Sequence, residues 1–422
     1  MFKDTVKELL IDNDHKRILL YGLEGLGKTY FACNLFKEIR GGFIIVNFKS
    51  DDTTGIINEL KKGKDITEAL VTAYGLSEVL QNVTFVLDEF TELDHIDGIS
   101  DLITEKKDSY RYKEIKILFI TSDVSWVTRH KDRFDECVKA GKVTFAQFLR
   151  KSGDSFYAGV VEAHMTKKKS MPSLIHNELI DMYYNYISTG GYIRAVSELT
   201  RDDQAVFAED LAAERYKTLI GNICSETKNT TSSFNKVQII NAIPECSKNS
   251  KFIISKTGRR HLSKEQLESD INDLVNEGIL IKINRLGSDT YSLALTDDAI
   301  YWYLLRKNRI KLNLSEEKIK DLVIENHLRN ILYEYGFKTI TWAGKYRFKI
   351  NILVESAGKY YPVRVSCNKS YRNLNYDEFL SKYGKMTSTH INFTENSFSE
   401  SGDSIYLPIY GCEYINSFIP QV

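Results

Sequence analysis

One stretch near the start of the 422-residue chain carries residues that could bind phosphate. Residues 22–29 read Gly-Leu-Glu-Gly-Leu-Gly-Lys-Thr, which completes the pattern GxxxxGK[ST]. Glycines let backbone N–H groups curl around phosphate oxygens, and the helix that follows adds the positive end of its dipole. In such a loop Lys28 reaches the β- and γ-phosphates of a nucleotide and Thr29 holds Mg²⁺. The other interpretation is an ordinary glycine-rich turn. The predicted phosphate-binding residues are Gly22, Leu23, Glu24, Gly25, Leu26, Gly27, Lys28 and Thr29.

Two carboxylates follow a second apolar stretch at residues 84–89, Thr-Phe-Val-Leu-Asp-Glu. Asp88, at the end of a strand, suits coordination of Mg²⁺ through water, and Glu89 suits polarisation of an attacking water as a general base. Paired acids after a strand are otherwise a solvated strand end. Together with residues 22–29, they predict a site that binds and hydrolyses ATP with Mg²⁺.

Further polar residues could complete this site. Ser122 follows an apolar run, where it could contact the γ-phosphate or the water, although a turn that caps the strand explains it as well. Arg129 and Arg133 lie just beyond, and either could act as an arginine finger toward a neighbouring subunit; a solvated helix face is the alternative. Arg194 follows Gly190-Gly191-Tyr192 and is a candidate sensor from a helical lid.

Short apolar runs separated by helical patterns must position these residues. The runs at residues 17–21, 43–48, 84–87 and 117–120 read as buried strands. Continuous apolar strands alternating with helices indicate an α/β fold with a parallel sheet covered on both faces. Ligands bind at the carboxyl edge of such sheets, where the predicted site residues would meet.

The remaining chain divides into further units by its patterns. Residues 154–225 are helical, with a break at Gly190-Gly191. A helix, then a helix that begins at a capping box of Ser263 and Gln266, then a hairpin over residues 279–295, follow the order of a winged helix. From residue 311 onward helix and strand patterns alternate again. We predict four domains, at residues 1–153, 154–225, 226–310 and 311–422.

Composition excludes several classes of protein. Lys and Arg number 57, as do Asp and Glu, so the net charge is zero and bulk electrostatic binding of polyanions is excluded. With 42% hydrophobic residues the chain is typical of a folded protein. Six scattered cysteines without metal-ligand spacing favour a reducing compartment. We see neither a signal peptide nor an apolar run long enough for a membrane span, so we expect a cytoplasmic protein without a membrane partner.

Two shorter windows depart from this balance. Residues 236–264 hold seven basic residues against Glu245, and residues 338–372 hold eight against Glu355. The second window also contains Trp342, Tyr346, Phe348, Tyr360, Tyr361 and Tyr371. Basic residues for phosphates and aromatic faces for bases are typical of nucleic-acid binding, while a solvated surface or a protein partner is the alternative. The helix between the windows argues against binding of nucleic acid in a major groove, because its carboxylates would repel the phosphate backbone. These acidic residues are Glu265, Glu268, Asp270, Asp273 and Glu277.

The chain resembles the prokaryotic AAA+ P-loop ATPases that carry a lid, a winged helix and a C-terminal domain of the PD-(D/E)XK nuclease type, relatives of the archaeal-type and STAND ATPases. The matching stretches are GLEGLGKTY (22–30), VLDEF (86–90), ITSD (120–123), TFAQFLR (144–150), GGYIRAV (190–196) and LVNEGILIK (274–282). The resemblance extends the nucleotide-binding stretch to Tyr30. It implies a P-loop ATPase sheet of the ASCE type with a helical lid, a winged helix and a C-terminal α+β restriction-endonuclease-like domain.

Two departures from that family pattern matter. Glu24-Gly25-Leu26 stands where the family usually has a basic residue, which leaves binding through backbone N–H groups intact. The nuclease core needs an Asp on one strand and E-x-K on the next to hold a metal. Asn351 and residues 364–366 (Arg-Val-Ser) are the equivalents here, and Glu325 alone survives. The resemblance therefore implies an ATP-dependent switch protein without nuclease activity.

Two functions remain open from the sequence. The first is an ATP-binding and ATP-hydrolysing switch that couples nucleotide state to its C-terminal modules, with a homo-oligomer if an arginine finger acts between subunits. The second is a nucleotide-gated scaffold that recognises nucleic acid or a protein partner with negligible turnover.

Overall fold

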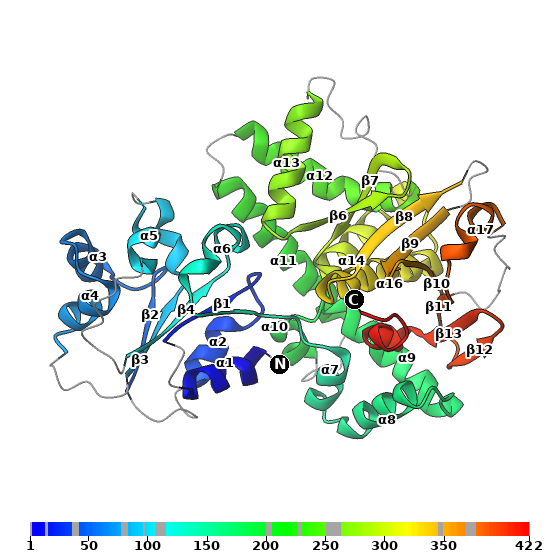
Figure 1. The fold of residues 1–422 in the computed structure, drawn as a ribbon, viewed down its shortest axis with the longest axis horizontal. Coiled ribbons are helices and arrows are strands. Elements are labelled where there is room, and N and C mark those ends of the chain that lie inside the picture. The colour runs from blue at the N-terminus through cyan, green and yellow to red at the C-terminus, as the bar shows by residue number, and fades with distance from the viewer. Residues whose placement is uncertain are drawn as a thin grey trace. The chain divides into compact units, whose positions relative to one another are not determined.

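The computed structural model describes residues 2–12, 16–35, 42–76, 83–95, 98–105, 115–199, 205–226, 230–249, 263–344, 349–367 and 377–421. The chain divides into two compact units, residues 1–142 and 143–422 (Figure 1). None of the described helices combines the length and the apolar character that a membrane crossing requires.

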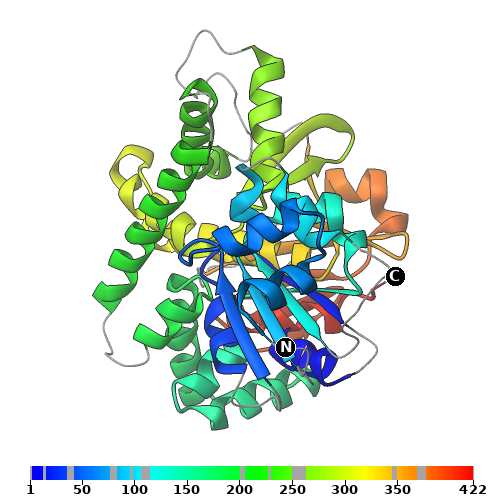
Figure 2. The same cartoon turned by 90° about the vertical axis from the view of Figure 1, so that its left-hand side faces the viewer.

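A five-stranded parallel sheet forms the centre of the first unit. Its strands are β1 (Arg17–Tyr21), β2 (Gly42–Asn47), β3 (Val83–Asp88), β4 (Lys116–Thr121) and β5 (Glu136–Lys139), in the order β2-β3-β4-β1-β5. All four neighbouring pairs are parallel, which confirms the predicted α/β sheet. Figure 2 shows these strands side by side with helices in front of them.

The fifth strand was not anticipated from the sequence. β5 reads Glu-Cys-Val-Lys, and its side chains are half-buried or exposed because it lies at the edge of the sheet. A central parallel strand is recognised by a continuous apolar run, and an edge strand does not need one. β5 pairs with β1, the strand that leads into the Gly22–Thr29 loop.

Among the described residues of the first unit, six helices and two 3-10 turns accompany the sheet. They are α1 (Phe2–Ile11), α2 (Lys28–Leu35), α3 (Thr54–Lys61), α4 (Ile66–Ala73), η1 (Phe90–His95), α5 (Ile99–Thr104), α6 (Val124–His130) and η2 (Lys131–Arg133).

An aromatic cluster supports the segments that follow β3 and β4. Phe90 packs edge-to-face against Phe119 at 5.5 Å and against Trp126 at 5.1 Å between ring centroids. Phe134 packs edge-to-face against Phe119 at 5.1 Å. Such pairs add about 0.5–1.5 kcal/mol each beyond burial. The cluster therefore fixes the backbone on both sides of the predicted site residues Glu89 and Ser122.

The second unit begins with helices. They are α7 (Phe145–Lys151), α8 (Ser155–Thr166), α9 (Ser173–Ser188), α10 (Ile193–Leu199), α11 (Ala205–Glu226), α12 (Thr230–Asn249) and α13 (Lys264–Asn276). The predicted break separates α9 from α10, where Gly190 has φ +63° and Gly191 has φ +71°. A Cβ on Gly190 would lie 3.0 Å from the Cβ of Ala299, so this turn requires glycine for close packing as well as for its backbone angle.

One eight-stranded sheet runs through the rest of the second unit. Its strands are β6 (Leu280–Arg285), β7 (Ser288–Leu295), β8 (Lys338–Ala343), β9 (Lys349–Ser356), β10 (Lys359–Ser366), β11 (His390–Thr394), β12 (Ser399–Ser401) and β13 (Ser404–Pro408), in the order β12-β13-β11-β10-β9-β8-β6-β7. β6 and β7 form the antiparallel hairpin expected over residues 279–295. Its strand β6 also pairs with β8 through Arg285 and Thr341. Segments predicted as the third and fourth domains therefore share a sheet.

The remaining helical elements are α14 (Asp298–Lys307), α15 (Arg309–Leu312), α16 (Glu316–Glu334), α17 (Asp377–Tyr383), and the 3-10 turns η4 (Gly384–Met386) and η5 (Ile409–Ser417).

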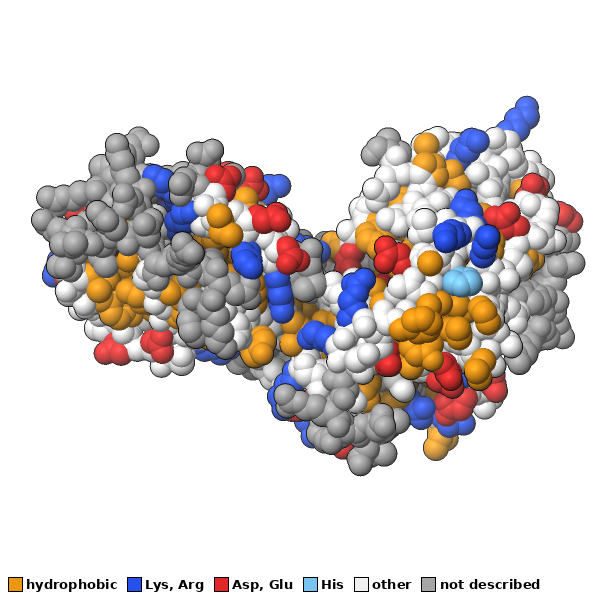
Figure 3. All heavy atoms as spheres, turned by 90° about the horizontal axis from the view of Figure 1, so that it is seen from below, with side chains coloured by type: hydrophobic (Ala, Val, Ile, Leu, Met, Phe, Trp, Pro, Cys, Tyr) orange, Lys and Arg blue, Asp and Glu red, His pale blue; other side chains and the backbone are white. Residues whose placement is uncertain are grey.

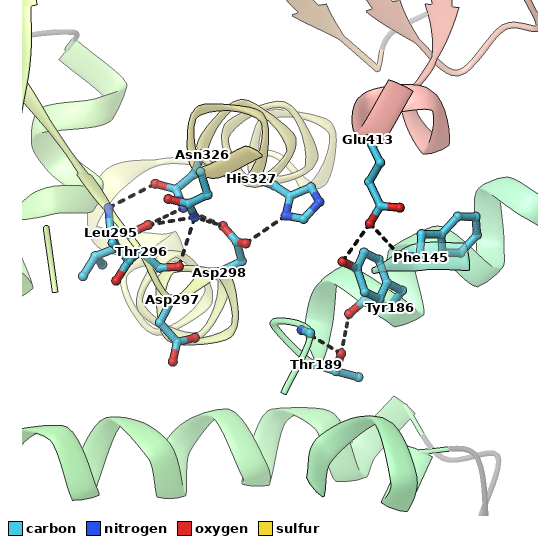
Figure 4. A network of polar contacts seen from close by, with 12 residues as sticks. Phe145, Tyr186, Thr189, Leu295, Thr296, Asp297, Asp298, Asn326, His327 and Glu413 are labelled. Carbon is cyan, nitrogen blue, oxygen red and sulfur yellow. Dashed lines mark hydrogen bonds and ion pairs between the residues drawn. The ribbon is translucent and has the colours of Figure 1, made fainter. Parts of the chain in front are cut away.

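A buried polar network joins α14 to α16 and to the end of β7 (Figure 4). Asp298 is fully buried and accepts hydrogen bonds from Asn326 and Asn330, each at 2.7 Å, and from His327 at 2.8 Å. Asn326 also pairs with the backbone of Leu295 in both directions, at 2.8 and 3.2 Å. Buried polar groups of this kind are costly unless satisfied, so the network specifies how these elements fit together.

A second buried carboxylate ties the first helix of this unit to its last turn. Glu413 accepts hydrogen bonds from the backbone N–H of Phe145 at 2.5 Å and from the hydroxyl of Tyr186 at 3.2 Å (Figure 4). Burial raises the pKa of Glu413. Since η5 is more than 200 residues from α7 and α9 in sequence, this contact holds the helical part and the C-terminal part of the second unit together.

Candidate phosphate-binding site

The Gly22–Thr29 loop connects β1 to α2 at the carboxyl edge of the first sheet. Gly22, Gly25 and Gly27 have φ of +146°, +84° and +78°. A Cβ on Gly22 would come within 2.9 Å of the carbonyl oxygen of Ala140. The loop therefore needs glycine for its backbone conformation, and at Gly22 also for the close approach of the chain after β5.

The Lys28 side chain lies inside this loop. Its residue is 4% exposed, and Nζ donates to the carbonyl of Gly22 at 2.7 Å, to the carbonyl of Leu23 at 3.0 Å and to Oγ of Ser122 at 2.9 Å. Burial lowers the pKa of Lys28, and the carboxylates of Glu89 and Asp88 oppose that change. A cation is thus held in a glycine-lined loop next to the tips of β3 and β4.

Asp88 provides a buried carboxylate beside the loop. It is fully buried at the end of β3, and its Oδ2 accepts from Nδ2 of Asn47 at 3.0 Å. Its Oδ1 is buried without a well-formed hydrogen bond among the described residues. Burial raises the pKa of Asp88, while the nearby Thr29 hydroxyl and Lys28 lower it. An oxygen in this state, with a hydroxyl beside it, fits the oxygen ligands that Mg²⁺ prefers.

Glu89 is held by Ser122 in an uncommon backbone conformation. Its φ is +51°, in the left-handed region that costs a residue with a Cβ about 1 kcal/mol. Its carboxylate accepts from the Ser122 backbone N–H at 2.9 Å and from the Ser122 hydroxyl at 2.6 Å. Because Lys28 also donates to that hydroxyl, Ser122 links the loop lysine to the candidate base.

The other residues of the predicted loop vary in exposure. Leu26 is buried and anchors the loop in the unit, whereas Glu24, Thr29 and Tyr30 are exposed. Tyr30 is 64% exposed, and its carbonyl accepts from the side chain of Asn34.

The two candidate finger arginines, Arg129 and Arg133, differ in their hydrogen-bond partners. Arg133 donates to Asp101 at 2.6 Å and to the hydroxyl of Thr104 at 2.9 Å, which ties it to α5. Arg129 is exposed on α6, where its Nε reaches the carbonyl of Ser125 at 3.4 Å. Since Arg133 already has a carboxylate partner, Arg129 is the better placed of the two to contact another molecule.

Arg194 belongs to the second unit. It lies on α10 with 68% of its side chain exposed, and it pairs with Glu198 at 2.9 Å and with Glu214 at 3.6 Å. Its assignment as a sensor of the nucleotide stays a prediction.

Asn47 is a site residue that the sequence reasoning missed. It stands at the end of β2, pairs in register with Asp88 and donates to that carboxylate. The signal was a polar residue near the end of the apolar run at residues 43–48, at the ligand-binding edge of a parallel sheet.

The nuclease-type positions in the second unit also meet. Nδ2 of Asn351 donates to Glu325 at 3.0 Å, and the guanidinium of Arg329 donates to the same carboxylate at 2.6 Å and to the backbone carbonyl of Asn351 at 3.1 Å. Among the described residues no group of three metal-ligating side chains exists. The guanidinium of Arg329 thus neutralises Glu325, the one acidic residue of the nuclease pattern that this chain retains.

The aromatic residues of the second basic window do not support the predicted role. Trp342, Tyr360 and Tyr361 are 4%, 7% and 6% exposed, because they pack in the core. The prediction that bases stack on these three residues is therefore wrong, since a base needs an exposed ring face. Tyr346, Phe348 and Tyr371 lie outside the described residues.

Each of the two basic windows contains a lysine that forms an ion pair with a carboxylate of the second unit. Lys338 pairs with Glu355 at 2.8 Å, and Lys236 is buried and pairs with Glu277 at 2.6 Å and Asp273 at 3.7 Å. The described basic and acidic side chains are interspersed on the face in Figure 3. The side chains of most other basic residues in these windows are outside the described residues, namely Lys248, Lys251, Lys256, Arg259, Arg260, Lys264, Lys345, Arg347, Lys369 and Arg372.

The acidic helix α13 uses most of its carboxylates inside the unit. Asp270 is fully buried and accepts from Ser232 at 2.6 Å and from Asn235 at 2.9 Å. Glu268 accepts from the hydroxyl of Tyr291 at 2.6 Å and pairs with Lys282 at 3.1 Å. The helix is acidic because it binds its neighbours α12, β6 and β7, so its sequence charge overstates its repulsion of phosphate.

Comparison with known proteins yields structural similarity without sequence relatives. No protein-family model matches the chain, and no curated protein matches it. The chain is similar to the Orc1 protein of Aeropyrum pernix in complex with DNA, with TM-score 0.33 and 15% identity over 74% of this chain and 93% of that chain. It is also similar to the RuvB Holliday junction branch migration motor of Thermotoga maritima, with TM-score 0.34 and 12% identity over 74% of this chain and 94% of that chain. For PCH-2 of C. elegans the TM-score is 0.30, with 17% identity over 54% of this chain and 62% of that chain. Scores at this level carry no functional assignment.

Proposed function

We propose that the chain is a Mg²⁺-dependent, ATP-binding and ATP-hydrolysing switch protein of the AAA+ P-loop type. The observation that carries this proposal is the position of Lys28, whose ammonium is buried in a loop built from three positive-φ glycines and lies beside two carboxylates and Ser122. Lysine is rarely buried in folded proteins unless its charge has partners. A cation in a glycine cradle is the arrangement that phosphate oxygens recognise.

Each site residue has a role in this proposal. The loop N–H groups and Lys28 bind the phosphates, and Thr29 and Asp88 hold Mg²⁺, which supplies charge neutralisation when bound. Asn47 orients Asp88 through its hydrogen bond. Glu89 accepts a proton from the attacking water once Ser122 no longer occupies its carboxylate. Arg194 and Arg129 are proposed as the sensor and the finger.

The modular organisation belongs to the same proposal. The helices α8–α11 would form the lid predicted at residues 154–225. The helices α12 and α13 with the β6–β7 hairpin would form a winged helix, and the strands β8–β13 with α16 a nuclease-like domain without its metal ligands. The shared eight-stranded sheet and the Asp298 network support transmission of a change through the whole second unit.

Phosphate release tests the hydrolytic part. Wild type and Glu89→Gln are compared with ATP and Mg²⁺, with Asp123→Asn as a control carboxylate outside the proposed machinery. Loss of general-base catalysis predicts about 100-fold or more slower release in Glu89→Gln, while the control keeps most of its rate. Equal rates in wild type and Glu89→Gln would remove Glu89 from the role of base.

A second candidate function is a nucleotide-gated scaffold with negligible turnover. The hydrogen bonds from Ser122 to the carboxylate of Glu89 favour it. Both carboxylate oxygens accept hydrogen bonds from Ser122. If nucleotide binding does not release them, ATP stays bound and intact. A flat, near-zero rate with and without added DNA, combined with ATP binding, supports the scaffold; stimulation by DNA supports the coupled ATPase.

A further inference from the structure

A basic surface on α11, α14 and α15 lies outside both basic windows and outside the phosphate loop. We call it the α14–α15 surface and define it by Lys217, Trp302, Arg306, Lys307, Ile310 and Lys311. Along α14 and α15 Trp302, Arg306 and Ile310 recur every four residues, as do Lys307 and Lys311, and Lys217 follows Tyr216 on α11. Residues 299–315 contain four basic residues and no acidic one. All of these residues belong to the second unit.

Aromatic rings hold two of its cations in place. The ammonium of Lys307 lies 5.3 Å from the ring centroid of Tyr216 and 5.7 Å from that of Tyr303. These two rings are 5.5 Å apart, which brings α11 against α14. The guanidinium of Arg306 lies 4.8 Å above the ring of Trp302. Cation–π contacts restrain these side chains without cancelling their charge.

The surface keeps a positive excess. Lys217, Lys307 and Lys311 are exposed, and none forms an ion pair with a carboxylate among the described residues. Three described acids lie near these cations. Glu316 is shared by Arg306 at 3.6 Å and by Arg309, Glu317 interacts with Arg309, and Glu214 lies one turn before Lys217 and pairs with Arg194.

An apolar side chain lies among these cations. Ile310 is 94% exposed, between Arg309 and Lys311, and Trp302 is half-buried one turn before Arg306. One exposed and one half-buried apolar side chain are far fewer than the roughly 20–30 residues that each side of a standard protein interface contributes. Separate cations around a small apolar and aromatic centre fit a chain of phosphates with attached bases.

We infer that the α14–α15 surface binds a nucleic-acid strand. Phosphates lie against Lys217, Lys307 and Lys311, and a base or sugar packs against Ile310 and the edge of Trp302. The inference does not depend on nucleotide binding at Gly22–Thr29. It also differs from the sequence-based expectation, because neither residues 236–264 nor residues 338–372 contribute.

Fluorescence anisotropy with a short labelled single-stranded oligonucleotide tests this inference. The full chain is compared with the variant K217E/K307E/K311E and with the control K167E/K169E/K385E, which makes the same change of net charge at exposed lysines elsewhere in the second unit. Each phosphate contact contributes about 0.7 to the slope of log affinity against log salt, so the variant should lose about 2 in slope. Its affinity at low salt should fall about tenfold or more, and the control should bind within about threefold of wild type.

Several results would overturn the inference. They are the absence of binding by the wild type, equal binding by the variant and the control, and retention of the salt slope in the variant. Tighter binding of polyglutamate or of anionic lipid vesicles than of the oligonucleotide would assign the surface to a different partner. If the charge-reversal variant does not fold by circular dichroism, K217Q/K307Q/K311Q replaces it and the same comparison applies.

Discussion

Removal of the Asp298 carboxylate should destabilise the second unit strongly. In Asp298→Ala the side-chain donors of Asn326, His327 and Asn330 lose an acceptor at 2.7, 2.8 and 2.7 Å, in a site with no exposure. A buried donor left unpaired costs about 1–3 kcal/mol, so these donors bracket a range of about 3–9 kcal/mol. Since Asn326 and Asn330 keep backbone carbonyl partners, we expect the lower part of the range, about 4 kcal/mol.

Differential scanning calorimetry measures this change. For a unit of this size, about 4 kcal/mol corresponds to a melting temperature about 10 °C lower. Asp289→Ala removes an exposed carboxylate near the start of β7 and should leave the transition unchanged within about 1 °C. Asp298→Asn should lie between them, because an amide oxygen still accepts from Asn326 or Asn330. If Asp298→Ala melts with the wild type, the network does not hold α14 to α16 and the reasoning fails.

Two other substitutions test the buried carboxylate of Asp88 and the close packing of Gly190. Because burial raises the pKa of Asp88, the charged form destabilises the unliganded fold above that pKa, and this destabilisation disappears as the pH falls below the ordinary carboxyl pKa. Asp88→Asn should therefore raise the melting temperature at neutral pH, have little effect in acid, and weaken Mg²⁺-ATP binding; a lower melting temperature at neutral pH contradicts this. Gly190→Ala places a Cβ 3.1 Å from the backbone nitrogen of Ala299 at φ +63° and should cost about 1–3 kcal/mol by calorimetry. Gly159→Ala is the matched control, because nothing lies within 4 Å of its Cβ in the exposed face of α8, and it should stabilise by about 0.5–1 kcal/mol. Equal melting temperatures of the two alanine variants would refute the packing role of Gly190.

The central strands of the first unit, β1, β3 and β4, were predictable because they are buried on both faces. Continuous apolar runs mark β1 to β4, and the glycine pattern marks the loop between β1 and α2. Residues at the strand ends, Asp88, Glu89 and Ser122, could be placed at one edge by topology alone. β5 escaped because an edge strand needs no apolar run. The contact between Glu89 and Ser122 escaped because it depends on a positive φ that no local residue pattern signals.

The second unit shows what composition cannot decide. A window of basic and aromatic residues looked like a nucleic-acid surface, but Trp342, Tyr360 and Tyr361 are core residues. An acidic helix looked repulsive, but Asp270, Glu268 and Glu277 serve the packing of α12, β6 and β7. Exposure and pairing depend on contacts between residues distant in sequence, and a composition window does not contain them.

Binding of Mg²⁺-ATP to the Gly22–Thr29 loop tests the central claim most directly. Isothermal titration calorimetry is performed on the wild type, on Lys28→Ala, and on Lys16→Ala as a control for a half-buried lysine before β1 that lies outside the loop. We predict saturable, Mg²⁺-dependent binding by the wild type and by Lys16→Ala, and an affinity at least about 100-fold weaker for Lys28→Ala, because a charge-assisted contact in a buried site is lost. Equal affinity of the wild type and Lys28→Ala, or no binding by the wild type, would contradict the account.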